Sequence, residues 1–137
     1  RFLLTLDDAI DLVMYAVDHM KGGEIYVKKA PSVRIMDLAK VIAESGGGSF
    51  KYKVIGMIPG EKLHEVLITE EELPRTVDRG EYFVISPWWA SLVHNDITEE
   101  YISSGAIEAN LSTIASLLER SDREFAKYGL HNSVFLK

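Results

Sequence analysis

The residues best suited to chemistry follow a short apolar run, residues 54–58, that ends in the turn Pro59-Gly60. Glu61 and Lys62 come directly after this turn. A strand that ends in a tight turn can present polar side chains to a ligand from a rigid base. A carboxylate accepts hydrogen bonds from hydroxyl donors, and an ammonium group is a point charge for anions. The pattern therefore predicts a site for a polar or anionic ligand.

Several of the candidate side chains also have an ordinary structural explanation. Glu61 is equally well explained as an acid in the first turn of a helix, where the helix dipole stabilises negative charge. His64 is interpreted as an exposed helix residue. Trp88 and Trp89 could stack on a base or a sugar ring, but a role in covering the edge of a core or an interface is favoured. No histidine pair stands at metal-ligand spacing with a carboxylate, so no metal site is predicted.

The composition is that of a folded acidic domain. The chain has 137 residues, enough for one domain, with 47% hydrophobic and 26% charged residues. A net charge of −6 argues against a nucleic-acid partner. No apolar run approaches the roughly 18 residues that span a bilayer, so no membrane insertion is expected. The absence of cysteine fits a reducing compartment, and we expect a cytoplasmic location.

Short strands and amphipathic helices alternate along the first half of the chain, which predicts an α/β fold. Thr5 is a candidate N-cap for a first helix that ends near Gly22. The elements expected after it are a strand over residues 24–28, a helix over 37–45 and a strand over 50–55.

The second half is less regular. Its expected elements are a short helix over residues 63–67, a capping box over 69–72, a strand over 81–86, a helix over 111–118 and a separate helical piece over 122–128. Residues 87–95 are expected to form a loop. We therefore divide the chain into a main lobe, residues 1–118, and a C-terminal helical extension and tail, residues 119–137.

Five short motifs occur in a characteristic order. They are Thr-Leu-Asp-Asp-Ala at 5–9, Gly-Gly-Glu-Ile-Tyr-Val at 22–27, Lys-Ala-Pro-Ser at 29–32, Asp-Leu-Ala-Lys at 37–40 and Pro-Gly-Glu-Lys-Leu-His-Glu at 59–65. Together they resemble the C-terminal, substrate-binding part of the UDP-N-acetylglucosamine 4,6-dehydratases. These are extended short-chain dehydrogenase/reductases of capsule and O-antigen biosynthesis. The resemblance is strong over residues 1–76, loose to residue 118 and absent beyond.

The resemblance implies the fold of a small C-terminal lobe that binds a UDP-N-acetylhexosamine, with NAD(P) in the complete enzyme. The full reaction would be 4,6-dehydration, with or without inversion at C5. The glycine-rich cofactor loop and the Tyr-Lys pair of the family are missing from this sequence. We therefore assign no catalytic and no cofactor-binding residue. The Rossmann half is expected to lie N-terminal to Arg1.

The family signature also implies roles for individual residues. Glu61 would accept hydrogen bonds from the ribose hydroxyls, on the turn made by Pro59 and Gly60. The family has an arginine for the diphosphate where this chain has Ile58, and Lys62 could supply a point charge nearby. Arg1 either faces the substrate or pairs with an early helix acid such as Asp8, and the pairing is favoured.

Three alternatives follow for the chain as a whole. It is the substrate lobe of a dehydratase and catalytically incomplete alone, or a non-catalytic binding or interaction domain derived from that family. In the third alternative, another subunit supplies the Rossmann half. The resemblance also implies a homo-oligomer.

Overall fold

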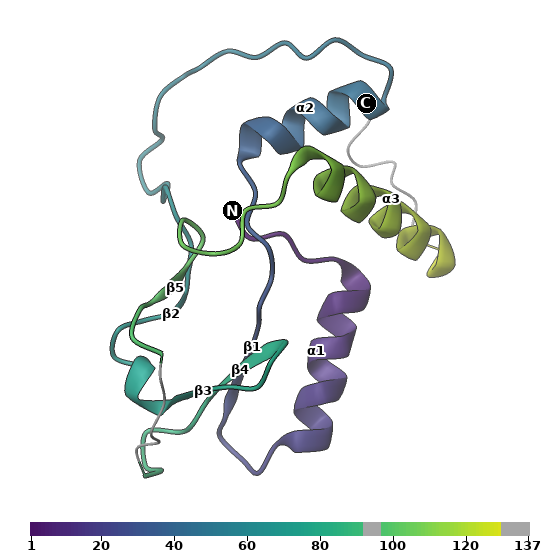
Figure 1. Cartoon of the computed structure of the whole chain (residues 1–137). Helices are drawn as coiled ribbons and strands as arrows, with labels where there is room; N and C mark the ends of the chain where they lie inside the picture. The colour runs from purple at the N-terminus through teal and green to yellow at the C-terminus, as the bar shows by residue number, and fades with distance from the viewer. Residues whose placement is uncertain (92–96, 130–137) are drawn as a thin grey trace.

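The computed structural model describes residues 1–91 and 97–129. Figure 1 shows α1 beside a small sheet in one part of the molecule, with α2 and α3 side by side in the other. The elements are α1 (Leu6–His19), β1 (Ile25–Lys28), α2 (Ile35–Ser45), β2 (Val66–Ile68), the 3-10 helix η1 (Leu73–Arg75), β3 (Thr76–Asp78), β4 (Tyr82–Ile85), β5 (Tyr101–Ile102) and α3 (Leu111–Lys127). The expected α/β class is confirmed.

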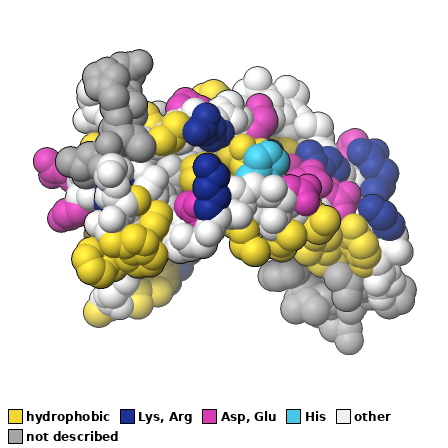
Figure 2. Space-filling model, turned by 90° about the horizontal axis from the view of Figure 1, so that it is seen from below, with side chains coloured by type: hydrophobic (Ala, Val, Ile, Leu, Met, Phe, Trp, Pro, Cys, Tyr) yellow, Lys and Arg dark blue, Asp and Glu magenta, His cyan; other side chains and the backbone are white. Residues whose placement is uncertain are grey.

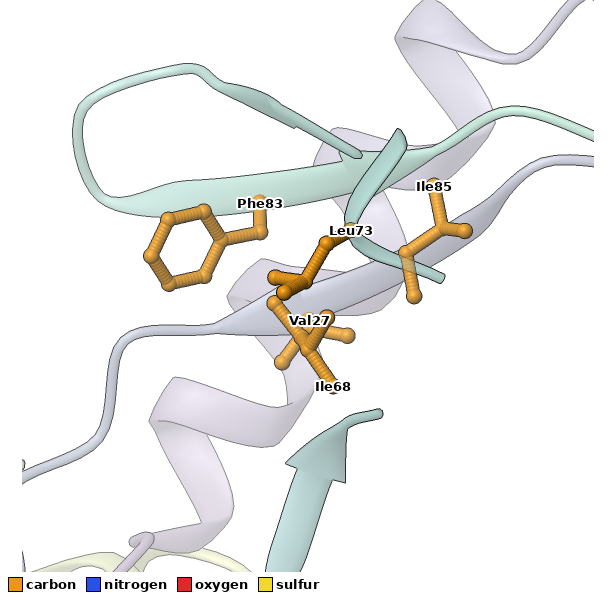
Figure 3. Packing of buried hydrophobic residues seen from close by; sticks show 5 residues of the cluster. All are labelled: Val27, Ile68, Leu73, Phe83 and Ile85. Atoms are coloured by element: carbon orange, nitrogen blue, oxygen red, sulfur yellow. The ribbon is translucent and has the colours of Figure 1, made fainter. Parts of the chain in front are cut away.

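The strands form two small antiparallel sheets. One has the order β1-β4-β3, with Val27 opposite Phe83 and Thr76 opposite Ile85, and the other pairs β2 with β5. Alternate side chains of β1 and β4 point to one face of the first sheet, where Ile68 of β2 and Leu73 of η1 pack against them. Figure 3 shows the resulting cluster of Val27, Ile68, Leu73, Phe83 and Ile85.

A second core joins α2 to α3. Val41 of α2 packs with Ile114 of α3, and Val33 and Ala109, which lie just outside the two helices, complete the buried cluster. The two cores are separate, so the connections between them decide how the sheet part and the helical pair are placed.

Arg120 of α3 ties that helix to the start of α1. Its guanidinium lies 2.7 Å from an Asp8 carboxylate oxygen, 2.8 Å from Glu124 and 2.7 Å from the Thr5 hydroxyl. Thr5 and Asp8 form the capping box of α1, and the Asp7 backbone N–H donates to Glu124, which is only 3% exposed. The contact therefore fixes the α1 N-terminus on α3.

These contacts shift the proton affinities of the two acids. Burial raises the pKa of Asp8 and of Glu124, but the hydrogen bonds that they accept, those from Arg120 first among them, outweigh burial. Both carboxyl groups therefore have a pKa below the ordinary value, and the pKa of Arg120 is raised, first by its hydrogen bond to Asp8. The three groups remain charged at neutral pH.

Two expected elements are wrong, and two expected helices form a single one. Residues 50–55 keep the alternation of a strand but form none, because none of the described strands pairs with them. The expected helix over 63–67 is absent, since Ile68 is fully buried in the first core and Val66 pairs with Ile102 in β2-β5. The pieces 111–118 and 122–128 are one continuous helix, α3, so the division at residue 118 falls inside it.

The other expectations fare better. The first helix, the strand over 24–28 and the helix over 37–45 are confirmed as α1, β1 and α2, and β4 confirms the strand over 81–86. The capping box at Thr69 becomes a turn that leads into η1 rather than a longer helix. Part of the expected loop and the end of the tail, residues 92–96 and 130–137, lie outside the described residues. In the described chain, no helix combines the length and the apolar character needed to cross a membrane.

Replacing Arg120 by Gln is expected to destabilise the chain by about 1–3 kcal/mol, because Glu124 stays buried without its cationic partner. The wild-type contribution is present above the ordinary carboxyl pKa values and is lost as the pH falls through the lowered ones. Urea unfolding at neutral pH and at about pH 4 should therefore show a smaller acid loss in the variant. Arg123→Gln, an exposed change on the same helix, is the control. Equal stability of the two variants would contradict this role.

Candidate functional site

A groove of about 660 Å³ lies where four distant parts of the chain meet. Its lining comes from the N-terminus, from residues 32–37 at the start of α2, from 61–64 after the Pro-Gly turn and from 103–108 after β5. Figure 1 shows the N-terminus beside the start of α2 and the connection from β5 to α3. We call this cavity the substrate groove, a name that refers to the function proposed for it.

Backbone hydrogen bonds hold the walls of the substrate groove together. Leu3 N–H donates to Pro31 over 2.9 Å, and Val33 N–H donates to Arg1 over 2.7 Å. Ser32 N–H donates to Ile107, and Ala109 N–H donates back to Ser32 over 2.7 Å. Residues 1–3, 31–33 and 107–109 therefore form a small three-segment ladder, although only single bridges join them.

Arg1 lines the substrate groove but does not pair with Asp8. Its guanidinium forms an ion pair with Glu65, and its N-terminal ammonium donates to the Val33 carbonyl over 2.7 Å. Asp8 pairs with Arg120 instead, because the capping box holds that acid at the α1–α3 contact. The expected pairing with Asp8 is wrong, and Arg1 remains a candidate ligand contact.

Glu61 and Lys62 line the same groove. The Glu61 N–H donates to the Ile58 carbonyl over 3.0 Å, and the Ile58 N–H donates to the Glu61 carboxylate over 3.2 Å. Gly60 has a φ of +87°, which a residue with a side chain rarely adopts, so this tight turn requires glycine. No helix begins here, so the explanation of Glu61 as a helix acid is wrong.

Pro59, Gly60 and Ile58 do not line the substrate groove. Pro59 and Gly60 shape the turn that carries Glu61, while the side chain of Ile58 is exposed outside the cavity. His64 lines the groove and is exposed, as expected, but not on a helix.

Several lining residues were not expected from the sequence. Arg34 lies just before α2 and pairs with Glu108, with 2.9 Å between Nε and Oε1. Ser103 accepts from the Glu65 N–H over 3.0 Å and donates its own N–H to the Glu65 carbonyl, which fixes the end of the 61–65 segment. No spacing in the sequence indicates that residue 34 lies near residues 62 and 104.

The charges of the substrate groove are mixed. Its cations are Arg1, Arg34 and Lys62, and two of them are paired with acids. No ion pair of Lys62 occurs in the described part of the chain. A groove with a free ammonium, two guanidinium groups and a carboxylate at the turn suits a ligand that has both anionic groups and hydroxyl groups.

A second hollow, of about 450 Å³, lies between α1 and the first sheet. Tyr15 stacks on His19 at 4.0 Å and on Tyr82 at 4.2 Å between ring centroids. The rings at this hollow therefore pack on one another. Trp88 and Trp89 line neither cavity and are 79% and 64% exposed. Stacking of either tryptophan on a ligand in the substrate groove therefore has no geometric support.

Within residues 1–91 and 97–129, no glycine-rich turn links a parallel strand to a helix. A dinucleotide-binding site needs such a turn. The link from β1 to α2, residues 29–34, contains no glycine, and the link from β5 to α3, residues 103–110, contains one. Both sheets are antiparallel. Nor do any three acidic or histidine side chains within residues 1–91 and 97–129 gather where a metal ion could be held.

Comparisons with known proteins agree with the motifs. A family model described as polysaccharide biosynthesis protein matches residues 1–87. A UDP-glucose 4-epimerase of Rickettsia akari is 34% identical over 128 residues, which cover 86% of this chain and 38% of that protein. A UDP-N-acetylglucosamine 4,6-dehydratase (inverting) of Campylobacter jejuni is 38% identical over 87 residues, 64% of this chain and 25% of that protein.

A solved structure supports the fold. The X-ray structure of Pen from Bacillus thuringiensis is similar with a TM-score of 0.75 and 29% identity, over 89% of this chain and 38% of that one. The chain spans less than two fifths of the length of the curated relatives that it matches. The similarity to Pen extends beyond the residues matched by the family model, so it also includes part of the region where the motifs fade.

Proposed function

The chain belongs to the polysaccharide biosynthesis protein family, and on this premise we propose that it is the substrate-binding lobe of a UDP-sugar-modifying enzyme. UDP-N-acetylglucosamine 4,6-dehydration is the reaction that the sequence motifs favour. The observation that carries the proposal is the substrate groove, in which Arg1, Glu61 and Lys62 come together from distant parts of the sequence.

The groups in the groove match the parts of a UDP-sugar. The Glu61 carboxylate can accept hydrogen bonds from two vicinal ribose hydroxyls. The Lys62 ammonium and the Arg1 guanidinium supply positive charge for the diphosphate. Ile58 lies outside the groove and cannot contribute, so the phosphate contact must differ from the family pattern.

The relatives differ in the sugar that their names specify. Relatives with matched segments of comparable identity carry the names UDP-glucose 4-epimerase and UDP-N-acetylglucosamine 4,6-dehydratase. Both names specify a UDP-hexose, so the UDP moiety is the shared ligand chemistry. We choose the dehydratase because the sequence Pro-Gly-Glu-Lys-Leu-His-Glu at residues 59–65 resembles the signature of the dehydratase family.

We further propose that catalysis needs a second polypeptide region, which supplies the Tyr-Lys pair and holds NAD(P). This region is a missing half of the same enzyme or another subunit. The relatives are more than twice as long as this chain, which leaves room for such a region. Homo-oligomerisation and a cytoplasmic location stay predictions.

The apolar face of α1 supports this division of labour. Tyr15 and Asp8 lie on the sides of α1 that contact the sheet and α3, whereas Val13, Met14 and Val17 are 59%, 54% and 54% exposed. None of the 14 residues of α1 is buried. Figure 2 shows hydrophobic side chains gathered in patches on the face of the molecule seen from below. Such a stripe on an amphipathic helix normally packs on another element.

Residues 50–58 offer a second surface for the same partner. Val54 and Ile55 are 80% and 73% exposed, and the segment has the alternation of a strand without a neighbouring strand. We propose that the cofactor-binding region covers α1 and pairs with this segment, because both surfaces combine exposed apolar side chains with unmet packing or pairing.

Changing Val13 and Val17 together to Asp is expected to disrupt this contact. The unmatched portion of the Campylobacter jejuni dehydratase, co-expressed with this chain, should co-purify with it, and the double variant should reduce recovery at least about tenfold, since a buried charge is costly. Arg123→Asp on α3 is the control, and circular dichroism checks the fold. Equal recovery of the wild type and the double variant would contradict the proposed surface.

Calorimetric titration with UDP and UDP-N-acetylglucosamine tests the nucleotide site. We expect saturable binding that Glu61→Ala weakens roughly tenfold to a hundredfold, because a charged hydrogen-bond acceptor contributes about 1.5–3 kcal/mol. Glu71→Ala removes an exposed carboxylate outside the groove and should bind like the wild type. Absence of binding at millimolar ligand would instead favour a non-catalytic interaction domain.

A further inference from the structure

Arg34 is a cation of the substrate groove for which the sequence motifs predict no role. Its side chain is 74% exposed and pairs with that of Glu108, which is itself 54% exposed. Ion pairs between side chains that are this exposed are weak, because water and salt screen them. The pair can therefore open at little cost when a stronger anion enters the groove.

The backbone around Arg34 is held in place while its side chain is not. The Arg34 carbonyl accepts the N–H groups of Asp37 and Leu38 over 3.0 and 3.1 Å at the start of α2. The preceding residue, Val33, is buried and bonded to Arg1. Because the backbone is fixed and the guanidinium is weakly held, the Arg34 side chain can move from Glu108 to an anion in the groove while its Cα stays in place.

The other cations of the groove are less suited to a phosphate. The side chain of Arg1 is more buried, at 28% exposed, and its guanidinium pairs with Glu65. Lys62 is a point charge without the planar fork that binds two phosphate oxygens at once. Ile58, at the position of the family arginine, carries no charge. Among the described lining residues, Arg34 alone combines a fork with a weak partner.

We propose that Arg34 binds the diphosphate of the UDP-sugar in this chain, exchanging Glu108 for phosphate oxygens when the ligand enters. The inference rests on the proposed function, because it assigns a residue to the same groove. Arg34 then takes over the contact that Ile58 cannot make, from a different wall of the cavity. Glu108 then competes with the phosphate for the Arg34 guanidinium and binds it when no ligand is present.

The competitor role separates this proposal from a structural role for the pair. If Glu108 only stabilised the fold, its loss would weaken or not affect ligand binding. If Glu108 competes with phosphate for Arg34, Glu108→Gln should strengthen UDP binding, and this gain should vanish when Arg34 is also replaced.

Calorimetry of four proteins tests the exchange: wild type, Arg34→Gln, Glu108→Gln and the double variant, each with UDP and with uridine. We expect Arg34→Gln to weaken UDP binding about tenfold or more and to leave uridine binding unchanged, because only UDP has the diphosphate. Glu108→Gln should strengthen UDP binding about twofold to tenfold, and only while Arg34 is present. Glu44→Gln, which removes one acid outside the groove near the end of α2, controls for net charge.

The outcomes separate this inference from the proposed function. UDP binding that Arg34→Gln retains at wild-type strength would overturn the role of Arg34 and leave the groove as the nucleotide site. A wild-type chain that binds no UDP would overturn both. Thermal unfolding followed by circular dichroism confirms that each variant is folded, so a loss of binding reports on the site.

Discussion

The hydrogen bonds that join residues 1–3, 31–33 and 107–109 connect the sheet part of the molecule to the pair formed by α2 and α3. The two hydrophobic cores are separate, one on the first sheet and one between α2 and α3. The ladder lies at the junction, where it brings Arg1, the start of α2 and the approach to α3 to one place. The ladder places Arg1 and Arg34 on the same groove, which Glu61 also lines.

The electrostatics of the groove follow from this arrangement. Each guanidinium is held by an acid from another segment, Arg1 by Glu65 and Arg34 by Glu108. The two pairs differ in exposure, and so in how easily they give way to a ligand. The ion-pair network around Arg120 has a structural role. Its acid Glu124 is buried, and its several contacts link α1 to α3. Charge thus stabilises the contact between α1 and α3, and in the groove we propose that it is available for exchange with a ligand.

Local sequence patterns predicted the elements that are specified by nearby residues, such as a helix with a capping box at its N-terminus. The capping box at Thr5 and Asp8, the β1 strand and the polar pair Glu61 and Lys62 were all visible in the sequence. Residues 50–55 were mispredicted because strand alternation does not reveal whether a partner edge exists. Residues 63–67 were mispredicted because burial of Ile68 overrides a helical stripe. The sequence does not indicate Arg34, because the groove that it lines forms only when residues 1, 61–64 and 103–108 fold next to it.

Backbone amide chemical shifts of the isotope-labelled chain, mapped during titration with UDP, test most directly whether UDP binds in the substrate groove. The largest shifts are expected in the walls of the substrate groove, at residues 32–37, 61–64 and 103–108. Shifts centred on the second hollow, at Tyr26 and Arg79 for example, would contradict this expectation, because those residues lie on the other side of the sheet from the first core. Saturating UDP that moves no amide of the groove would contradict it equally.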